Sequence, residues 1–219
     1  MSVAELVWRP EYRSIVVIDM VGSGRWDDCA QLRSREALDV VVRAAFRAVG
    51  VEWGTLVVED RGDGMILLVP PDVSKVDLLG PLVPTLAKGL REYNSVVGEG
   101  LRIRLRVAIH AGEVLRGPSG WVGTDLYLAC RLVNSSPLYQ ELVRSPEVDL
   151  VVVVSQAMHD AVVRHGYPGI DRAAYTQVRV VAKEVETTAW LHVPGPAVAP
   201  PGREGITVAA PREWNHRVH

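Results

Sequence analysis

The sequence predicts an α+β domain: a mostly antiparallel sheet with helices on one face. Three observations predict this class. Short β-branched segments such as "SIVVIDM" and "DLVVVVS" alternate with longer segments of helical periodicity. A hairpin within residues 51–69 interrupts the alternation. The elements therefore follow one another as a βαββαβ core of the ferredoxin-like kind, with an αβαββ extension.

The individual elements follow from apolar spacing and from the residues that stop it. The first strand stops at glycines, and the helix after it carries apolar residues at helical spacing until Gly50. Pro70 and Pro71 end the third strand, and two prolines make the start of the next helix uncertain. The expected strands are 14–20, 51–58, 65–69, 101–110, 149–155 and a hairpin over 176–193; the expected helices are 29–49, 76–97, 124–136 and 156–166.

Composition limits the class of protein. A chain of 219 residues with 48% hydrophobic residues can bury a real core, and a net charge of −2 gives no overall basic surface for nucleic acid. Cys29 and Cys130 have no metal-type spacing, the N-terminus has no signal-like apolar run, and the longest apolar stretch is too short for a bilayer. We expect a cytoplasmic protein with one domain over 1–193, a flexible Pro/Gly/Ala-rich tail over 194–219, and no membrane or nucleic-acid partner.

Two aspartates end segments that the fold brings together. Asp19 closes the first strand, and Asp63 lies in the "VEDRGDGMILL" hairpin. Two close carboxylates repel each other and need a cation to stay ionised, and oxygen ligands suit Mg²⁺ or Mn²⁺. The alternatives are a strand-end cap for Asp19 and a plain Asp-Gly turn for Asp63.

A glycine-rich loop follows the first aspartate. Gly22 and Gly24 flank Ser23 and allow backbone N–H groups to approach a ligand just before a helix begins. This spacing is typical of a phosphate-binding loop, although no Gly-Lys-Ser/Thr follows as in a Walker A motif. Gly22, Ser23 and Gly24 are therefore candidate substrate-binding residues.

Four motifs in order resemble the catalytic domain of class III nucleotidyl (adenylate/guanylate) cyclases. They are "IVVIDMVGSG", "VEDRGDGMILL", "LRIRLRVAIHAGEV" and "GWVGTDLYLACRLVNSS", and "VVAKEVETTAWLHV" is similar to the closing hairpin of that family. The resemblance covers residues 12–193. It implies a homodimer with active sites at the interface, two Mg²⁺ or Mn²⁺ ions, and conversion of a nucleoside triphosphate to a 3′,5′-cyclic monophosphate and pyrophosphate.

The resemblance assigns roles to four residues. Asp19 and Asp63 match the two metal-binding aspartates of the family. Arg131 matches the arginine that stabilises phosphate charge in the transition state, and Lys183 matches the lysine that binds the triphosphate. The non-functional alternative for Arg131 and Lys183 is a solvated surface charge. His110 in "AIHAGE", which has no carboxylate partner in view, is predicted to be structural.

The positions that face the nucleoside differ from the family pattern. Glu59 stands where adenylate-type members have lysine, which argues against adenine and leaves guanine and uracil open. Gly120 supplies no side chain at the second base-reading position, and Tyr127 replaces an asparagine that would contact ribose. Tyr127 could narrow the pocket toward a pyrimidine, stack on the base, or abolish catalysis. Ser23 replaces an aromatic residue, which we expect to change loop packing rather than chemistry.

These departures are similar to those of bacterial pyrimidine cyclases of the Pycsar type. The resemblance implies conversion of UTP to cyclic UMP, a second messenger of anti-phage defence that activates a separate effector protein. Guanylate cyclase activity is one alternative. A catalytically inactive cyclase-homology module that binds a nucleotide or a partner is the other.

Overall fold

The computed structural model describes residues 9–195, so most of the predicted tail over 194–219 lies outside the described residues. The strands are β1 (Glu11–Met20), β2 (Val57–Asp60), β3 (Gly64–Val69), β4 (Leu105–Gly117), β5 (Gly120–Val122), β6 (Leu150–Ser155), β7 (Tyr175–Ala182) and β8 (Val185–His192). The α-helices are α1 (Asp28–Ala48), α2 (Lys75–Leu79), α3 (Leu82–Val96), α4 (Thr124–Val133), α5 (Ser136–Arg144) and α6 (Gln156–Ala161). Within the described part of the chain, no helix is both long and apolar enough to cross a bilayer.

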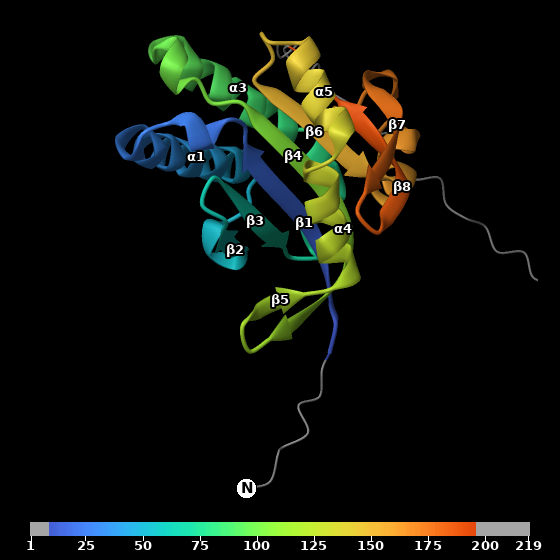
Figure 1. Cartoon of the computed structure of the whole chain (residues 1–219). Coiled ribbons are helices and arrows are strands. Elements are labelled where there is room, and N and C mark those ends of the chain that lie inside the picture. Colours follow the sequence, from blue (N-terminus) through green and yellow to red (C-terminus); the bar gives the residue numbers. More distant parts are fainter. Residues whose placement is uncertain (1–8, 196–219) are drawn as a thin grey trace, which may run out of the picture.

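One mixed sheet organises the fold, in the strand order β2-β3-β1-β4-β6-β8-β7 (Figure 1). β1 pairs antiparallel with both β3 and β4, and the pairing of β4 with β6 is parallel. The short strand β5 pairs only with the far end of β4, and these two strands form an arm that projects below the sheet in Figure 1. The predicted α+β class is therefore confirmed.

Helices cover both faces of the sheet, whereas the sequence pattern predicted one. On one face, Val16 and Ile18 of β1 pack with α1 and α3; on the other, Ile15 and Val17 pack with α4 and α5. Every residue of β3 and of β6 is buried, as expected of strands covered on both sides. The second layer consists of α4, which was expected as a helix but not on this face, and α5, which was not expected as a separate helix.

Three predicted elements have different boundaries. The strand expected over 51–58 shrinks to β2, because Trp53–Thr55 forms a 3-10 turn whose Trp53 ring packs edge-on against Phe46. The helix expected over 76–97 divides into α2 and α3 at Gly80 and Pro81. The helix expected over 124–136 ends at Val133, and α5 starts with a proline in its first turn.

The strand predicted over 101–110 starts at Leu105 and continues through the segment expected to be a loop. Residues 111–117 pair partly with β1 and partly with β5, which gives them backbone partners that the glycine-rich composition did not indicate. The final hairpin was predicted correctly as β7 and β8.

Tyr175 at the start of β7 is expected to make the free energy of unfolding depend on pH in the alkaline range. Burial raises the pKa of the Tyr175 phenol to about 12 from 10.0, and the residue is only 7% exposed. In the unfolded chain the phenol ionises first, so the folded state loses stability as pH rises from about 10 to about 12. Two pKa units correspond to about 3 kcal/mol.

We therefore expect the free energy of unfolding of the native protein to fall by up to about 3 kcal/mol more than that of Tyr175→Phe over this range. Urea titrations of both proteins at intervals from pH 9 to pH 12 measure the difference. Parallel pH profiles for the two proteins would show that the phenol stays accessible to solvent.

Candidate functional site

The end of β1 lies between two strands that hold candidate residues. In the sheet register Asp19 is opposite Gly64 of β3 on one side and Arg106 of β4 on the other. A side chain at position 64 is impossible without movement, because its Cβ would lie 2.2 Å from the Ile18 carbonyl oxygen. Glycine at 64 thus lets the "GDG" turn approach β1 closely.

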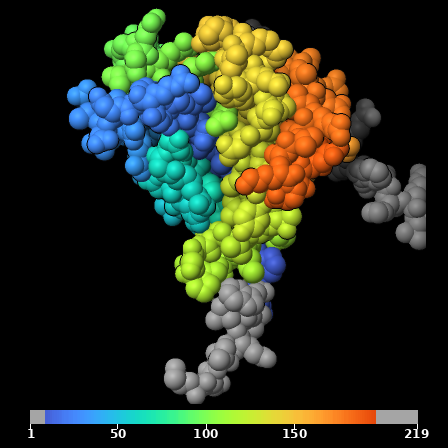
Figure 2. Space-filling model, viewed as in Figure 1, coloured from blue at the N-terminus to red at the C-terminus, as the bar shows by residue number. Residues whose placement is uncertain are grey.

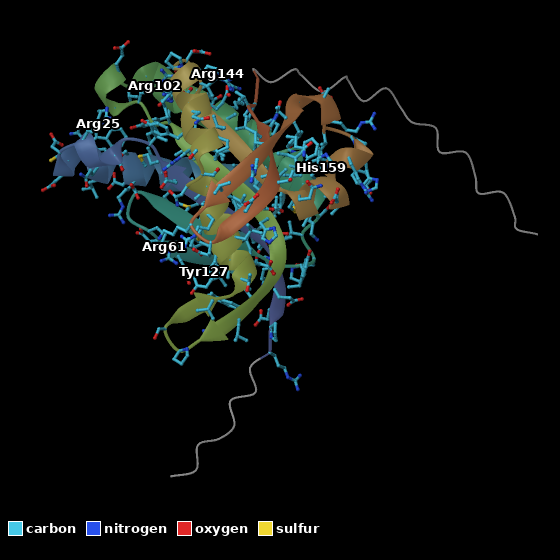
Figure 3. The ribbon with its side chains drawn as sticks, turned by 45° about the vertical axis from the view of Figure 1, so that its right-hand side comes forward. Arg25, Arg61, Arg102, Tyr127, Arg144 and His159 are labelled. Atoms are coloured by element: carbon cyan, nitrogen blue, oxygen red, sulfur yellow. The ribbon has the colours of Figure 1, made fainter. Side chains whose placement is uncertain are left out.

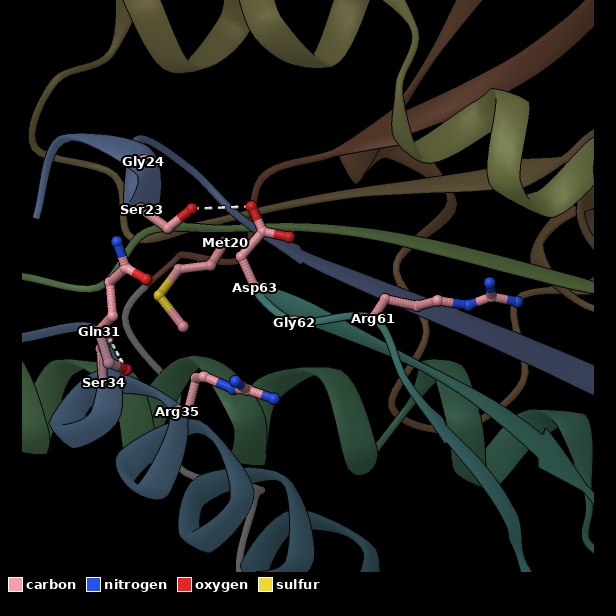
Figure 4. Close-up of a pocket in the computed structure, with 9 residues that line it drawn as sticks. All are labelled: Met20, Ser23, Gly24, Gln31, Ser34, Arg35, Arg61, Gly62 and Asp63. Carbon is pink, nitrogen blue, oxygen red and sulfur yellow. Dashed lines mark hydrogen bonds between the residues drawn. The ribbon is translucent and has the colours of Figure 1, made fainter. Parts of the chain in front are cut away.

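Asp63 is held beside this strand end through its backbone and its side chain. Its carbonyl oxygen accepts a 2.9 Å hydrogen bond from the Met20 N–H. Its carboxylate Oδ2 accepts a 2.7 Å hydrogen bond from the Ser23 Oγ (Figure 4). The strand end and the loop after it therefore fix the position of Asp63.

Asp19 is partly buried and paired with Arg106. Its Oδ2 accepts hydrogen bonds from Arg106 Nε, at 3.0 Å, and from Nη2. Burial raises the pKa of the Asp19 carboxyl, the hydrogen bond and charge of Arg106 lower it, and the charge of Asp63 raises it further. The charge of Asp63 therefore acts on the Asp19 carboxyl.

Ser23 has a larger effect than a change in loop packing. Its side chain is buried, donates to Asp63, and lines a cavity of about 280 Å³ between the β1–α1 loop and helix α1 (Figure 4). Gln31, Ser34 and Arg35 of α1 line the same cavity. A serine at this position therefore orients a candidate metal ligand, in addition to leaving polar space beside it.

A second set of candidate residues meets on the other side of the β2–β3 turn. Glu59 Oε1 accepts a 3.3 Å hydrogen bond from the Trp121 N–H, and its Oε2 accepts a 2.7 Å hydrogen bond from Arg61 Nη2. A Cβ added to Gly120 would lie 3.3 Å from Glu59 Oε1. The two predicted base-reading positions, Glu59 and Gly120, are therefore neighbours in the fold.

Helix α4 carries two further candidate residues, Tyr127 and Arg131. Tyr127 is 56% exposed, and Arg131 pairs with Glu184 at 3.1 Å, next to Lys183. Lys183 has φ 54°, and it is the single non-glycine residue with positive φ among those described. A lysine in this left-handed conformation keeps a cation at the tip of the β7–β8 hairpin where glycine or asparagine would be less strained.

Cys130 on α4 is influenced by charges from both α4 and the β2–β3 turn. Burial raises the pKa of the Cys130 thiol, the charges of Arg61 and Arg131 lower it, and the charge of Glu59 raises it. Figure 2 shows the β2–β3 region, α4 and the β7–β8 hairpin side by side on one face. The candidate residues therefore form two groups: the β1 group (Asp19, Ser23, Asp63 and Arg106) and the α4 group (Glu59, Arg61, Gly120, Tyr127, Arg131 and Lys183).

Within the described residues, 9–195, no hydrogen bond or ion pair connects a side chain of the β1 group to a side chain of the α4 group. Arg61, although two residues from Asp63, extends away from that carboxylate in Figure 4. The two groups are thus not joined by any side-chain contact, although Arg61 lines the same cavity as Ser23 and Asp63.

Two carboxylates of the β1 group are of the type that could bind a magnesium ion. In the described part of the chain, no three His, Cys, Asp or Glu side chains gather as a metal cage. Mg²⁺ commonly binds through one or two carboxylates and takes its other ligands from water and substrate phosphates. Asp19 and Asp63, with hard oxygen donors only, fit that pattern.

His110 does have a carboxylate partner, contrary to what the sequence indicated. Its Nε2 lies 3.1 Å from Asp125 Oδ1 and its Nδ1 lies 2.7 Å from Ser155 Oγ, but His110 and Ser155 are each 3% exposed. A nucleophilic serine must reach substrate, so this Ser–His–Asp arrangement is structural. Asp125 Oδ2 also accepts a 2.7 Å hydrogen bond from the Glu113 N–H, which ties the start of α4 to β4.

Arg106 and Arg61 are the candidate residues that sequence reasoning missed. Arg106 lies in the alternating "LRIRLRVAIH" segment, and only the register of β4 on β1 brings it to Asp19. Arg61 lies in the turn directly after β2, and its guanidinium reaches back to Glu59 at 2.7 Å. Asp60, by contrast, is exposed and pairs with Arg35 of α1.

Known structures share this fold with the chain. The guanylyl cyclase Cya2 matches with a TM-score of 0.60 and 17% identity, over 85% of this chain and 92% of that one. An adenylate/guanylate cyclase/hydrolase from Silicibacter pomeroyi matches with a TM-score of 0.60 and 16% identity, over 85% and 98%. The catalytic core of a rhodopsin-guanylyl cyclase in complex with ATPαS matches with a TM-score of 0.55 and 13% identity, over 84% and 96%.

No protein-family model and no curated protein matches the sequence itself. At these identities the structural matches show the fold alone. The chain therefore has the fold of adenylate and guanylate cyclase catalytic domains over nearly the whole length of those domains.

The contacts of Asp125 are expected to contribute to the free energy of unfolding by attaching the start of α4 to β4. Asp125→Ala removes the partner of the exposed Glu113 N–H and of the buried His110, and a buried group left without its partner costs about 1–3 kcal/mol. We expect the free energy of unfolding in urea to fall by about that amount. Asp28→Ala, which removes an exposed acid from the first turn of α1, should cost less than about 1 kcal/mol. Equal losses in the two variants would contradict a specific role for Asp125.

Proposed function

We propose that the protein is a nucleotidyl cyclase. The 3′-oxygen of a nucleoside triphosphate attacks the α-phosphorus, an O3′–P bond forms, and the bond to the β-phosphate oxygen breaks. Pyrophosphate leaves with its electron pair, and the hydroxyl proton passes to solvent. The observation that carries this proposal is the meeting of Asp19 and Asp63 at the strand end of a cyclase fold.

The β1 group would hold two Mg²⁺ or Mn²⁺ ions through Asp19 and Asp63. When bound, such ions lower the pKa of a hydroxyl nucleophile and offset charge on phosphate oxygens. Arg106 neutralises Asp19 in the protein without metal, and Ser23 aims the Asp63 carboxylate. The loop after β1 contains Gly22, Ser23 and Gly24, and Gly22 has a left-handed backbone conformation with φ 80°. This loop would bind the phosphates.

Arg131 and Lys183 would bind the triphosphate from the α4 group. Arg131 now pairs with Glu184, whose side chain is 65% exposed. An ion pair with so exposed a carboxylate has little energetic value, so exchanging Glu184 for a phosphate costs little. The fixed fork of a guanidinium suits the charge that builds on phosphate oxygens in the transition state.

A homodimer would bring the two groups together. Because they do not contact each other within one chain, a two-fold dimer can place the β1 group of one copy against the α4 group of the other. A dimeric guanylyl cyclase domain from Blastocladiella emersonii, with a TM-score of 0.53 and 14% identity over 83% of this chain and 96% of that one, is among the similar structures. Each dimer would then contain two composite sites.

Base choice is the part of the proposal that this chain's own residues decide. Glu59 accepts N–H donors and does not suit the ring nitrogen of adenine, and Gly120 offers no side chain. We propose UTP as substrate and cyclic UMP as a second messenger in anti-phage defence, acting on a separate effector protein. Guanylate cyclase activity is the alternative that Glu59 equally supports.

An inactive nucleotide-binding module is the second candidate function. The observation in its favour is Tyr127, a bulky exposed side chain where the similar family has asparagine. In that case the protein would bind a nucleoside triphosphate and release it unchanged.

Purified protein incubated with Mn²⁺ and each of the four ribonucleoside triphosphates tests the enzyme directly. We expect cyclic UMP, identified by mass, and a loss of at least about a hundredfold in Asp63→Ala, because one carboxylate of the metal site is removed. Asp72→Ala, an exposed acid in the turn after β3, should keep full activity. Absence of any cyclic product would contradict the proposal, and full activity of Asp63→Ala would contradict the metal site.

A further inference from the structure

We propose that Arg61 determines base specificity, as the partner of Glu59 in reading the edge of the base. This inference rests on the proposed nucleotide site and concerns which bases it accepts. Gly120 leaves the second base-reading position without a side chain, and Arg61 is the charged group that stands beside the first. The pair recognises a base that presents a ring N–H next to a carbonyl, as uracil and guanine do.

The geometry of Glu59 sets half of this recognition. Its side chain is 23% exposed, and each of its oxygens already accepts one N–H, from Trp121 and from Arg61. A carboxylate oxygen can accept two hydrogen bonds, so each oxygen keeps the capacity for one more donor. These two contacts fix the direction in which Glu59 can accept a ring N–H.

Arg61 supplies the complementary donors. Its side chain is 55% exposed, and one Nη2 contact to Glu59 leaves other guanidinium N–H groups available. It extends away from the Asp63 carboxylate, although both residues line one cavity, and it lies on the same side of the molecule as Tyr127 (Figures 3 and 4). Glu59 and Arg61 therefore offer a base edge a hydrogen-bond acceptor with hydrogen-bond donors next to it.

Only some bases match that arrangement. Uracil has a carbonyl on each side of its N3–H, so Arg61 can donate to a carbonyl from either side of Glu59. Guanine has a carbonyl on only one side of its N1–H. Cytosine and adenine present a ring nitrogen lone pair where Glu59 needs a donor. The pair therefore favours uracil most and disfavours cytosine and adenine.

An ordinary surface ion pair is the competing explanation for Arg61. Such a pair has little energetic value and no effect on ligand choice. Three features distinguish this one: the carboxylate is mostly buried, both of its oxygens are positioned by protein donors, and the lack of a side chain at Gly120 allows the close approach of Glu59 Oε1. An exposed arginine–carboxylate pair with none of these features, Arg43 with Asp39 on α1, provides the matched control.

Binding of 3′-deoxynucleoside triphosphates tests the inference without requiring turnover. These compounds lack the attacking hydroxyl, so calorimetric titration with Mn²⁺ present reports base preference alone. We expect the native protein to bind the uracil and guanine compounds at least about tenfold more tightly than the cytosine and adenine compounds, a typical discrimination for a matched polar pair. Arg61→Met should reduce this ratio to near one, Arg61→Lys should reduce it partly, and Arg43→Met should leave it unchanged.

Three results would overturn the role of Arg61: an unchanged ratio in Arg61→Met, an equal loss of affinity for all four bases, or no binding of any of them by the native protein. Selective binding by a protein that forms no cyclic product would contradict the cyclase proposal and leave the base-reading role intact. Cyclase activity whose base preference is unchanged in Arg61→Met would support the cyclase proposal and contradict the base-reading role of Arg61.

Discussion

The pairing of β1 with β3 on one side and β4 on the other is the constraint on which the candidate site depends. It sets Asp19 opposite both Gly64 and Arg106, and the missing side chain at Gly64 lets the Asp63 turn lie against β1. Two carboxylates are thereby held close at a partly buried strand end, where burial and mutual repulsion raise the pKa of Asp19. Arg106 and Ser23 offset that cost in the absence of a cation.

Much of the fold was predictable because strands and helices leave strong periodic signals. Residues 14–20 and 149–155 are β-branched runs that could only be buried strands, and they form β1 and β6. The pairing of Asp19 with the Asp63 turn followed from placing the first strand beside the hairpin. Boundaries failed where a tertiary contact decides them: the 3-10 turn at Trp53 depends on packing against Phe46, and α5 covers a face that periodicity alone does not reveal.

The candidate site was less predictable wherever two segments distant in sequence have to meet. Arg106 is one of several alternating arginines, and only strand register selects it for Asp19. Ser23 and Asp63 lie 40 positions apart in the sequence, so their hydrogen bond could not be seen there, and a serine in place of an aromatic residue suggested altered packing alone. Likewise, the contact of Glu59 with the backbone of Trp121 depends on how the β4–β5 arm folds back toward β2.

The central claim is that one chain carries two complementary half-sites, the β1 group and the α4 group, which act only across two copies. Asp63→Ala and Arg131→Ala each damage a different half-site. Co-expression of the two variants with different affinity tags, followed by isolation of the mixed dimer, gives one composite site with both changes and one with neither. We predict that each variant alone is inactive and that the mixed dimer recovers about half the cyclase activity of the native dimer. A mixed dimer as inactive as its parents, beside an active native protein, would contradict the claim.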